Sequence, residues 1–261
     1  MGKGKIPYII SVANQKGGVG KTTTSVSLAT IAANRSNKAL IIDLDPNAHA
    51  TSVLTKKKEK HKNNSFTFLQ GMDFRQTIYK TSKPNLHLIP GVEELYKFEK
   101  KYGKNPLKSI ILNKRLERIF QSADYDYIFI DCPSTVGALQ FNAVTSSDMV
   151  IIPAVPEFLS LNGFNQLLLT LRQINSKLNK VCNYYLLFTM YQDQISSHRS
   201  VVEWADTKIK EILFKNKIPF DESFMEANNH GVNVIDEMPA SQGSQSYTSV
   251  YVEIQNIAKE R

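Results

Sequence analysis

The sequence is poor in cysteine and has no apolar run long enough to cross a membrane. Its two cysteines, Cys132 and Cys182, are separated in the chain, which argues against a disulfide framework or a zinc knuckle and is typical of a reducing compartment. The first five residues read MGKGK, so we expect no secretory signal segment. The longest apolar runs, such as residues 149–155, have the length of a strand and fall short of the roughly 20 residues of a bilayer span. We therefore expect a cytoplasmic protein that is not integral to a membrane.

Glycine and proline are also few, with 12 and 10 residues in a chain of 261. This excludes collagen-like and low-complexity sequences, and 42% hydrophobic with 21% charged residues is typical of a globular protein. The length suits one large α/β domain with a substantial core. Lysine and arginine number 32 against 24 aspartates and glutamates, which gives a net charge of +8. This excess favours nucleic acid or another anionic surface as a partner, without choosing between them.

Apolar runs of strand length alternate with stretches whose apolar residues recur every three or four positions. The runs expected to be strands are residues 8–13, 39–42, 86–89, 127–130, 149–152 and 184–189. The stretches expected to be helices are residues 22–33, 93–102, 107–121, 159–178 and 201–214. Continuously apolar strands that alternate with helices predict a mostly parallel sheet covered by helices on both faces. Because no repeat or linker divides the chain, we expect residues 1–261 to form a single α/β domain.

A glycine-rich segment, NQKGGVGKTTT at residues 14–24, lies between the first expected strand and the first expected helix. Its glycines at positions 17, 18 and 20 allow positive φ angles and bring backbone N–H groups close to phosphate oxygens, at the positive end of the helix dipole. Lys21 supplies a charge for the terminal phosphates, and the Thr22 hydroxyl can bind Mg²⁺. The segment therefore predicts a phosphate-binding loop of the P-loop NTPase type.

This loop departs from the strict Walker A pattern, because position 15 is Gln where a glycine is usual, and it has a second lysine, Lys16. The resulting K-G-G-V-G-K-T-T resembles the deviant Walker A loop of the ParA/MinD ATPases, a branch of the P-loop NTPases that also contains the nitrogenase iron protein. The resemblance implies ATP as the nucleotide and a homodimer that forms on ATP binding. It also implies that Lys16 reaches the partner's phosphates and takes part in catalysis.

Residues 39–47 read ALIIDLDPN, a buried strand that ends in Asp43 and Asp45. Carboxylates at the C-terminal end of a strand lie where α/β sheets bind ligands, so either can hold the attacking water or the water shell of a metal. The segment resembles the family motif D-x-D-P-Q, with Asn47 in place of Gln. The resemblance implies that Asp45 orients the water and that Asp43 has a metal-side or structural role. In the alternative, both aspartates only cap the following helix.

Residues 125–134 read YDYIFIDCPS and have the pattern of a Walker B strand. Asp131 at the end of this strand is expected to hold Mg²⁺ through water. Family members usually have D-x-P-P here, and Ser134 replaces the second proline, which leaves the stiffness of this segment open. We interpret Cys132 as a small buried apolar residue, because no histidine lies near it in the sequence.

The resemblance extends from Tyr8 to about Ala258 and includes segments at the adenine end of the site, where Met190 and Pro219 are expected to contact the base. The full set expected to bind the nucleotide is Lys16, Gly17, Gly18, Val19, Gly20, Lys21, Thr22, Thr23, Met190 and Pro219. The set expected to bind metal is Thr22, Asp43 and Asp131, and the expected catalytic residues are Lys16 and Asp45.

Within this family, ParA proteins bind DNA without sequence preference and release it when a ParB-like partner stimulates hydrolysis, whereas MinD proteins bind membranes through a C-terminal amphipathic helix. The tail from residue 251 has Val252, Ile254 and Ile257 but no aromatic or leucine-rich face flanked by lysines, so a membrane anchor is unsupported. Two separated cysteines argue against an iron–sulfur carrier. We therefore expect a nucleoid-associated partition ATPase for a plasmid or chromosome. The alternatives are a MinD-like positioning ATPase, acting at a membrane or on another protein cargo, and a ligase of the same fold.

The DNA-binding residues are less clear from the sequence. The family segment D-P-R-S, which supplies an arginine for DNA, reads MPAS at residues 238–241. The basic residues that we expect to contact DNA instead are Arg199, Lys208, Lys210, Lys215 and Lys217. A second basic segment, KKKEKHKNN at residues 56–64, has five lysines and one glutamate. For both groups, the alternative is a solvated surface with no role.

Overall fold

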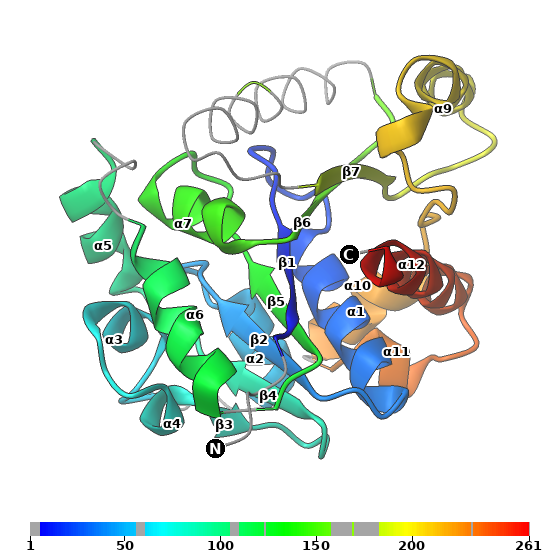
Figure 1. The fold of residues 1–261 in the computed structure, drawn as a ribbon. Coiled ribbons are helices and arrows are strands. Elements are labelled where there is room, and N and C mark those ends of the chain that lie inside the picture. The colour runs from blue at the N-terminus through cyan, green and yellow to red at the C-terminus, as the bar shows by residue number, and fades with distance from the viewer. Residues whose placement is uncertain are drawn as a thin grey trace.

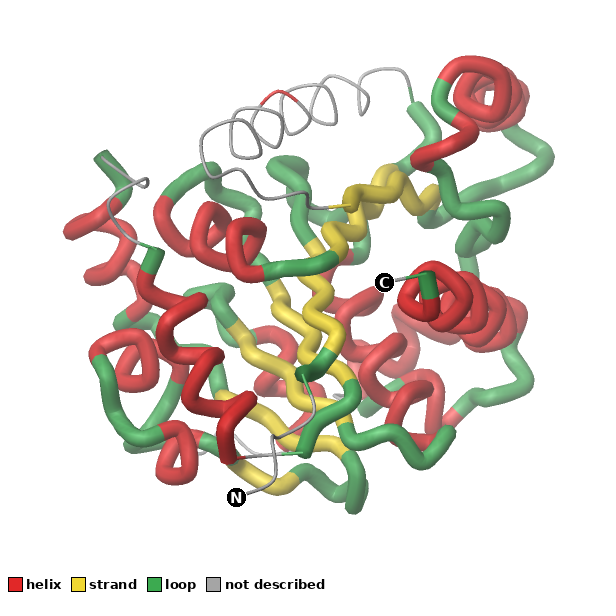
Figure 2. Tube along the Cα trace, in the orientation of Figure 1, coloured by secondary structure: helices red, strands yellow, loops and turns green. Residues whose placement is uncertain are grey.

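The computed structural model describes residues 6–55, 61–104, 110–122, 124–157, 169, 183–230 and 232–260. These residues form a seven-stranded sheet with the order β3-β4-β2-β5-β1-β6-β7 (Figure 1, Figure 2). Its strands are β1 (Tyr8–Val12), β2 (Ala39–Asp43), β3 (Tyr79–Lys80), β4 (Leu86–Ile89), β5 (Tyr127–Asp131), β6 (Met149–Ala154) and β7 (Asn183–Phe188). Neighbouring strands are parallel, except that β3 pairs with β4 in the antiparallel direction at one edge. The expected mostly parallel α/β sheet is confirmed.

Helices lie on both faces of the sheet, as expected. On one side are α3 (Ser65–Gln70), α4 (Phe74–Thr77), α5 (Leu95–Tyr102), α6 (Ile111–Ser122) and α7 (Ala138–Ser146), and on the other are α1 (Lys21–Asn34), α2 (His49–Thr55), α10 (Glu222–His230), α11 (Val234–Glu237) and α12 (Gln242–Lys259) (Figure 1). Beyond β7 lie α9 (Ser196–Lys208) and the short 3₁₀ helix η2 (Lys210–Ile212).

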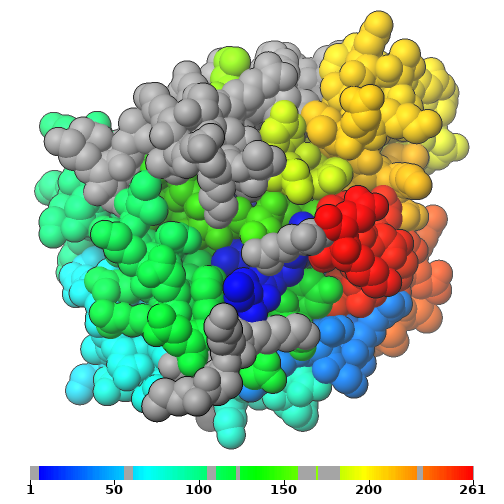
Figure 3. Space-filling view, viewed as in Figure 1, coloured from blue at the N-terminus to red at the C-terminus, as the bar shows by residue number. Residues whose placement is uncertain are grey.

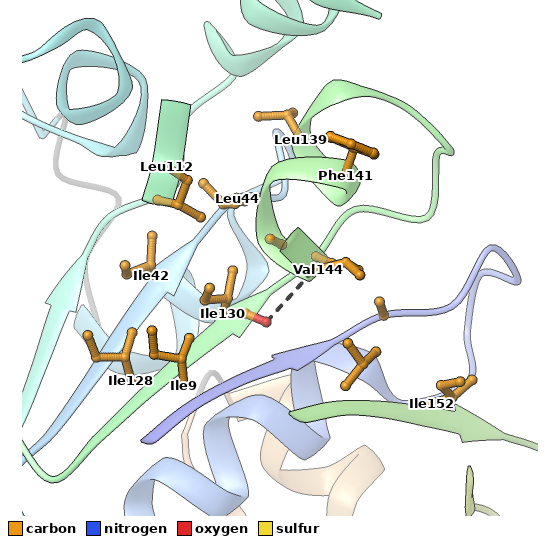
Figure 4. Close-up of a cluster of buried hydrophobic side chains, with 14 of the residues drawn as sticks. Ile9, Ile42, Leu44, Leu112, Ile128, Ile130, Leu139, Phe141, Val144 and Ile152 are labelled. Atoms are coloured by element: carbon orange, nitrogen blue, oxygen red, sulfur yellow. Dashed lines mark hydrogen bonds between the residues drawn. The ribbon is translucent and has the colours of Figure 1, made fainter. Parts of the chain in front are cut away.

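The sheet separates two hydrophobic cores, because successive side chains of a strand point to opposite faces. On β1, Ile9 belongs to the core beneath α6 and α7, whereas Ile10 belongs to the core beneath α1 and α12. Figure 4 shows the first core, where Ile9 and Ile128 from adjacent strands lie close together. Since both faces are covered, the central strands are buried at every position and mostly apolar, which explains the nearly continuous apolar runs in the sequence.

The expected strands agree with the structure to within two residues at either end, but β3 was not expected. It is only two residues long and lies at the edge of the sheet, so it has no periodic pattern to detect. The expected helix over residues 201–214 was wrong at both ends, since α9 begins at Ser196 and ends at Lys208. The backbone N–H of Phe214 bonds to Leu186 O on β7, which draws the chain out of the helix and alongside the sheet.

The expected helix over residues 159–178 lies outside the described residues, apart from position 169, and so do residues 56–60 of the basic segment. The end of that segment is described. Asn64 caps α3, because its side-chain oxygen accepts a hydrogen bond from Thr67 N at 3.1 Å. The helix expected at 107–121 is observed as α6, and its first positions, 107–109, are also outside the described part of the chain.

The C-terminal helix α12 packs its aromatic residues against α1. Tyr247 and Tyr251 are buried, the Tyr247 hydroxyl lies 2.9 Å from Thr24 Oγ1, and the Tyr251 hydroxyl accepts a hydrogen bond from Asn37 Nδ2 at 3.1 Å. In Figure 3 this helix, in red, lies directly beside the blue residues of the N-terminal part. The apolar face of α12 is therefore part of the core. Within the part of the chain that the structure describes, no helix is long and apolar enough to span a membrane.

Helix α7 has no side-chain cap of its own, because its N-cap residue is Gly137. Glu99 on α5 supplies one from a distant part of the chain, since its carboxylate accepts hydrogen bonds from Ala138 N at 2.6 Å and Leu139 N at 3.0 Å. A negative group at the positive end of a helix dipole is favourable. A Cβ at position 137 would lie 1.7 Å from Glu99 Oε1, so the carboxylate occupies the space that glycine leaves free.

We expect Glu99→Ala to lower the free energy of unfolding by about 2 kcal/mol, because two charge-assisted hydrogen bonds are lost at a helix N-terminus. Urea unfolding followed by circular dichroism measures this change. Glu94→Ala is the matched control, because Glu94 is exposed at the start of the same helix and makes no side-chain capping bond. Equal losses in the two variants would contradict the assignment of Glu99 as the cap.

Candidate functional site

The glycine-rich segment forms a loop between the end of β1 and the start of α1, at the C-terminal edge of the sheet. Gly18 and Gly20 have φ angles of 72° and 83°, in the left-handed region that favours glycine. Two contacts with distant parts of the chain hold the loop: Asn14 Nδ2 donates to Pro153 O at 2.7 Å, and Thr189 Oγ1 donates to Val19 O at 3.0 Å. Within the loop, Asn14 Oδ1 also accepts a hydrogen bond from Lys16 N at 3.0 Å. The sequence analysis did not single out Asn14 or Thr189, whose roles depend on neighbouring strands.

Lys21 is the first residue of α1, and its side chain is buried beneath the loop. Its ammonium donates hydrogen bonds to Lys16 O at 3.0 Å and to Ser134 Oγ at 2.9 Å. Burial lowers the pKa of Lys21, and the charge of the nearby Asp131 carboxylate opposes this effect. Ser134, which stands where family members usually have a second proline, thus provides a hydroxyl group that contacts Lys21. An ammonium held at this place can attract the terminal phosphates of a bound nucleotide.

Asp131 lies at the end of β5, between β1 and β2, and is fully buried. Its carboxylate accepts hydrogen bonds from Thr22 Oγ1 at 2.8 Å and from Ser25 Oγ at 3.0 Å. Burial raises the pKa of Asp131, and the carboxylate of Asp43 on the neighbouring strand raises it further. Ser25 was not expected, although it lies one helical turn after Lys21 on the same side of α1.

Thr22 and Asp131 together fit the requirements of Mg²⁺. Both supply oxygen atoms, which are the ligands that this hard cation prefers, and the Thr22 hydroxyl already contacts the carboxylate. Mg²⁺ is commonly bound by one or two carboxylates, waters and substrate phosphates, so the two residues need only phosphate and water to complete the site. A bound cation would also favour the ionised form of the buried carboxylate.

Asp43 makes contacts typical of a structural residue. One of its oxygens accepts from Asp45 N at 3.0 Å, and the other accepts from Thr51 N at 2.9 Å and Thr51 Oγ1 at 2.7 Å. A Cβ at position 91 would lie 2.6 Å from Asp43 Cγ, which explains the glycine there, and Gly91 N donates to Thr51 Oγ1 at 2.8 Å. Burial raises the pKa of Asp43. Of the two roles expected for Asp43, these contacts favour the structural one.

Asp45 lies two residues beyond the end of β2 and faces a cavity. Its Oδ1 accepts from Asn47 N and Asn47 Nδ2, both at 2.9 Å, so the Asn47 side chain holds the carboxylate in place. Its contacts are thus confined to its own turn, unlike those of Asp43. The carboxylate is therefore available to a water molecule in the cavity.

The cavity has a volume of about 540 Å³ and lies over the phosphate loop. Its lining includes Gly18, Gly20, Lys21, Thr22, Thr23, Asp45, Asn47, His49, Ser134 and Met190. An adjoining pocket of about 100 Å³ shares Gly20, Thr23 and Met190 with it and also contains Pro219, Phe220 and Met225. The structure therefore brings most of the expected nucleotide residues together around one space, with Met190 and Pro219 at one end.

Lys16 does not line this cavity. It is exposed, and its ammonium lies 3.1 Å from the Oε2 of Glu157, which follows β6. Gly17 is exposed beside it, and Val19 is buried under the loop. The ammonium of Lys16 thus contacts Glu157, a residue that the sequence analysis missed, and does not contribute to the lining of the cavity of its own chain.

The basic residues expected to bind DNA lie apart from the cavity. Arg199 and Lys208 are on α9, Lys210 is in η2, and Lys215 and Lys217 follow it. The Arg199 guanidinium donates to Asp193 O, and the Lys217 ammonium lies 5.5 Å from the centre of the Tyr191 ring. Four acidic residues, Asp193, Glu203, Asp206 and Glu211, are interspersed among them.

Comparison with known proteins gives consistent relatives. A family model described as an AAA domain matches residues 7–184. The chain is 35% identical over 248 residues to the sporulation initiation inhibitor protein Soj of Bacillus subtilis (94% of this chain, 97% of Soj) and 31% identical over 255 residues to the chromosome partitioning protein ParA of Caulobacter vibrioides (97% and 95%). Among solved structures, a proposed plasmid partition protein of Borrelia burgdorferi B31 bound to AMPPNP matches with a TM-score of 0.80 and 27% identity, covering 97% of this chain and 100% of that one.

We expect Lys21→Ala to abolish ATP binding, because Lys21 is the cation that lies within the cavity beneath the phosphate loop. Fluorescence titration with a labelled ATP analogue measures the affinity. Lys16→Ala, five positions away in the same loop, is the control and should still bind ATP as a monomer. Near-wild-type affinity in Lys21→Ala, with its circular dichroism spectrum unchanged, would exclude this loop as the phosphate site.

Proposed function

The chain belongs to the ParA-type partition ATPases of the ParA/MinD family, and we propose that it uses ATP to move plasmid or chromosome DNA. The observation that supports this most directly is the buried Lys21 beneath a glycine-rich loop, with Thr22 and Asp45 lining the same cavity and the buried Asp131 hydrogen-bonded to Thr22. In this proposal the whole chain acts as one ATPase unit in the cytoplasm, on the nucleoid.

ATP binds with its phosphates on the loop and its base toward Met190 and Pro219. The backbone N–H groups of residues 17–20 and the N-terminus of α1 attract the phosphates, and Lys21 exchanges its bonds to Ser134 and Lys16 O for bonds to phosphate oxygens. Thr22 and Asp131 hold Mg²⁺, which neutralises charge on the phosphates when bound.

Asp45 orients the water that attacks the terminal phosphate. Hydrolysis of a phosphoanhydride depends mainly on positioning and electrostatic stabilisation, with little covalent work by the protein. Asp45 meets this requirement, because Asn47 fixes its carboxylate at the edge of the cavity. Asp43 contributes indirectly, by bonding Asp45 N and Thr51 and so holding the turn that carries Asp45.

Lys16 serves the second protomer of an ATP-bound homodimer. Its exposed ammonium, paired with the exposed Glu157, exchanges this contact for one with the second protomer at little cost, because an exposed ion pair contributes about 1 kcal/mol or less. A dimer presents two basic surfaces to one duplex, so ATP raises the affinity for DNA by avidity. A ParB-like partner then stimulates hydrolysis, which separates the protomers and releases the DNA.

We expect Asp45→Ala to bind ATP and Mg²⁺ and to hydrolyse ATP at least about 100-fold more slowly, because the orientation of water matters more to the transition state than to binding. Phosphate release measures turnover. Asp43→Ala should instead lower the melting temperature, because it leaves Thr51 and Asp45 N without their buried acceptor. If Asp45→Ala turned over normally and Asp43→Ala were stable but inactive, the two roles would be reversed.

We expect wild-type DNA affinity to increase with ATP over ADP, to be independent of sequence and to fall steeply with added salt. Fluorescence anisotropy with a labelled duplex at two salt concentrations measures all three properties. Lys16→Ala should bind ATP yet show no ATP-dependent dimer in analytical ultracentrifugation and no increase in DNA affinity. DNA binding that is undetectable, or insensitive to ATP and salt, would reject DNA as the surface on which this ATPase acts.

A further inference from the structure

The surplus of positive charge is unevenly distributed between two parts of the chain. Over residues 61–104 and 110–122, which include α3 to α6, there are 11 lysines and arginines against five aspartates and glutamates. Over residues 183–217, which include α9 and the basic residues singled out from the sequence, there are five against four. Opposite charges that lie close together produce little electric field a few ångströms away. The α9 region, with nearly equal numbers of both, therefore attracts a polyanion only weakly.

Helix α5 carries the densest part of this surplus. Lys97, Lys100, Lys101 and Lys104 are all exposed, with spacings of three, one and three residues. At 3.6 residues per turn these positions fall within an arc of roughly 100°. Gly103, after the last helical residue, keeps helical dihedral angles (φ −58°, ψ −31°), so Lys104 continues the same row.

The row faces outward, opposite the side by which α5 is anchored. Leu95 and Phe98 are buried in the core, and Tyr102 packs its ring 4.7 Å from that of Phe98. Figure 1 shows α5 on the outer side of the molecule, with α6 on the same side. Helix α6 adds the exposed Lys114 and Arg118.

The acidic residues in and next to α5 offset little of this row beyond Lys97. The Glu99 carboxylate is engaged by Ala138 N and Leu139 N at the start of α7, on the other side of the helix. Glu93 and Glu94 precede the helix by one or two positions and lie four and three positions before Lys97, close enough to offset its charge. At 1.5 Å per residue they lie about 9 Å or more along the axis from Lys100, Lys101 and Lys104, so these three lysines keep most of the positive charge of the row.

We propose that the outward face of α5, formed by Lys97, Lys100, Lys101 and Lys104, is the main DNA-binding surface of this protein, which rests on the proposed function as a partition ATPase. The row extends about 10 Å, and a DNA strand carries one phosphate per 3.4 Å of helix axis, so it spans roughly three phosphates of one strand. Lysines act as point charges without fixed hydrogen-bonding geometry, which suits contact with the phosphate backbone and not with base edges.

Two variants that remove equal charge from different surfaces test this proposal. The first replaces Lys97, Lys100, Lys101 and Lys104 with glutamine, and the second does the same to Lys208, Lys210, Lys215 and Lys217. Each lowers the net charge from +8 to +4, so any effect of overall charge is the same in both. DNA affinity is measured by anisotropy with ATP and Mg²⁺ over a range of salt concentrations, and the circular dichroism spectrum and ATP affinity check that each variant is folded.

We expect the α5 variant to bind DNA at least about 10-fold more weakly than wild type. In a plot of the logarithm of the binding constant against the logarithm of the salt concentration, its negative slope should become shallower by about 2 to 3. The second variant should remain within about threefold of wild type. Equal losses in both variants, or a larger loss in the second, would overturn the assignment to α5 while leaving the proposed function intact. Wild-type protein that binds no DNA with ATP would overturn both.

Discussion

The site depends on two opposite charges held away from water at the C-terminal edge of the sheet. Lys21 is 6% exposed and Asp131 is fully buried, so burial opposes the charged form of each, and the Asp131 carboxylate in turn favours the charged form of Lys21. The parallel register of β1, β2 and β5 determines where Asp131 lies, and the loop after β1 determines where α1 presents Lys21 and Thr22 to it. In the proposed function, a nucleotide phosphate pairs with Lys21 and a cation pairs with Asp131.

The surrounding residues maintain this arrangement at some cost to stability. Asp43 lies beside Asp131 on adjacent strands, so two carboxylates are buried close together and repel each other. Three hydrogen bonds from Asp45 N and Thr51 compensate Asp43, and the space for its carboxylate exists only because residue 91 is glycine. A buried polar group of this kind is tolerated when all its acceptors are satisfied. The result is a rigid turn that carries Asp45.

A chain of contacts also connects the cavity to the outer surface. Lys21 contacts Ser134, and the segment from Ser134 to Gly137 leads into α7, whose first turn is held by Glu99 of α5. The other side of α5 carries the row of lysines. The proposed DNA-binding surface and the candidate nucleotide cavity are therefore separated by one helix and one short segment. A change at Ser134 on nucleotide binding would act on elements that pack directly against α5.

The sequence by itself determined the order of the strands along the chain, the phosphate loop and the aspartates at strand ends. These features are local, because apolar runs, glycine spacing and a residue's position relative to its strand can be read within about ten residues.

Tertiary structure alone decided the partners of those residues. Ser134 contacts Lys21 across 113 positions, and Thr189 contacts the loop across 170. The contacts of Asp43 with Thr51 and its close approach to Gly91, which only the fold shows, favour the structural one of the two roles that its motif left open. The excess of basic residues around α5 can be counted in the sequence, but only the fold shows that Glu99, in the middle of this helix, turns away from its neighbours to cap α7.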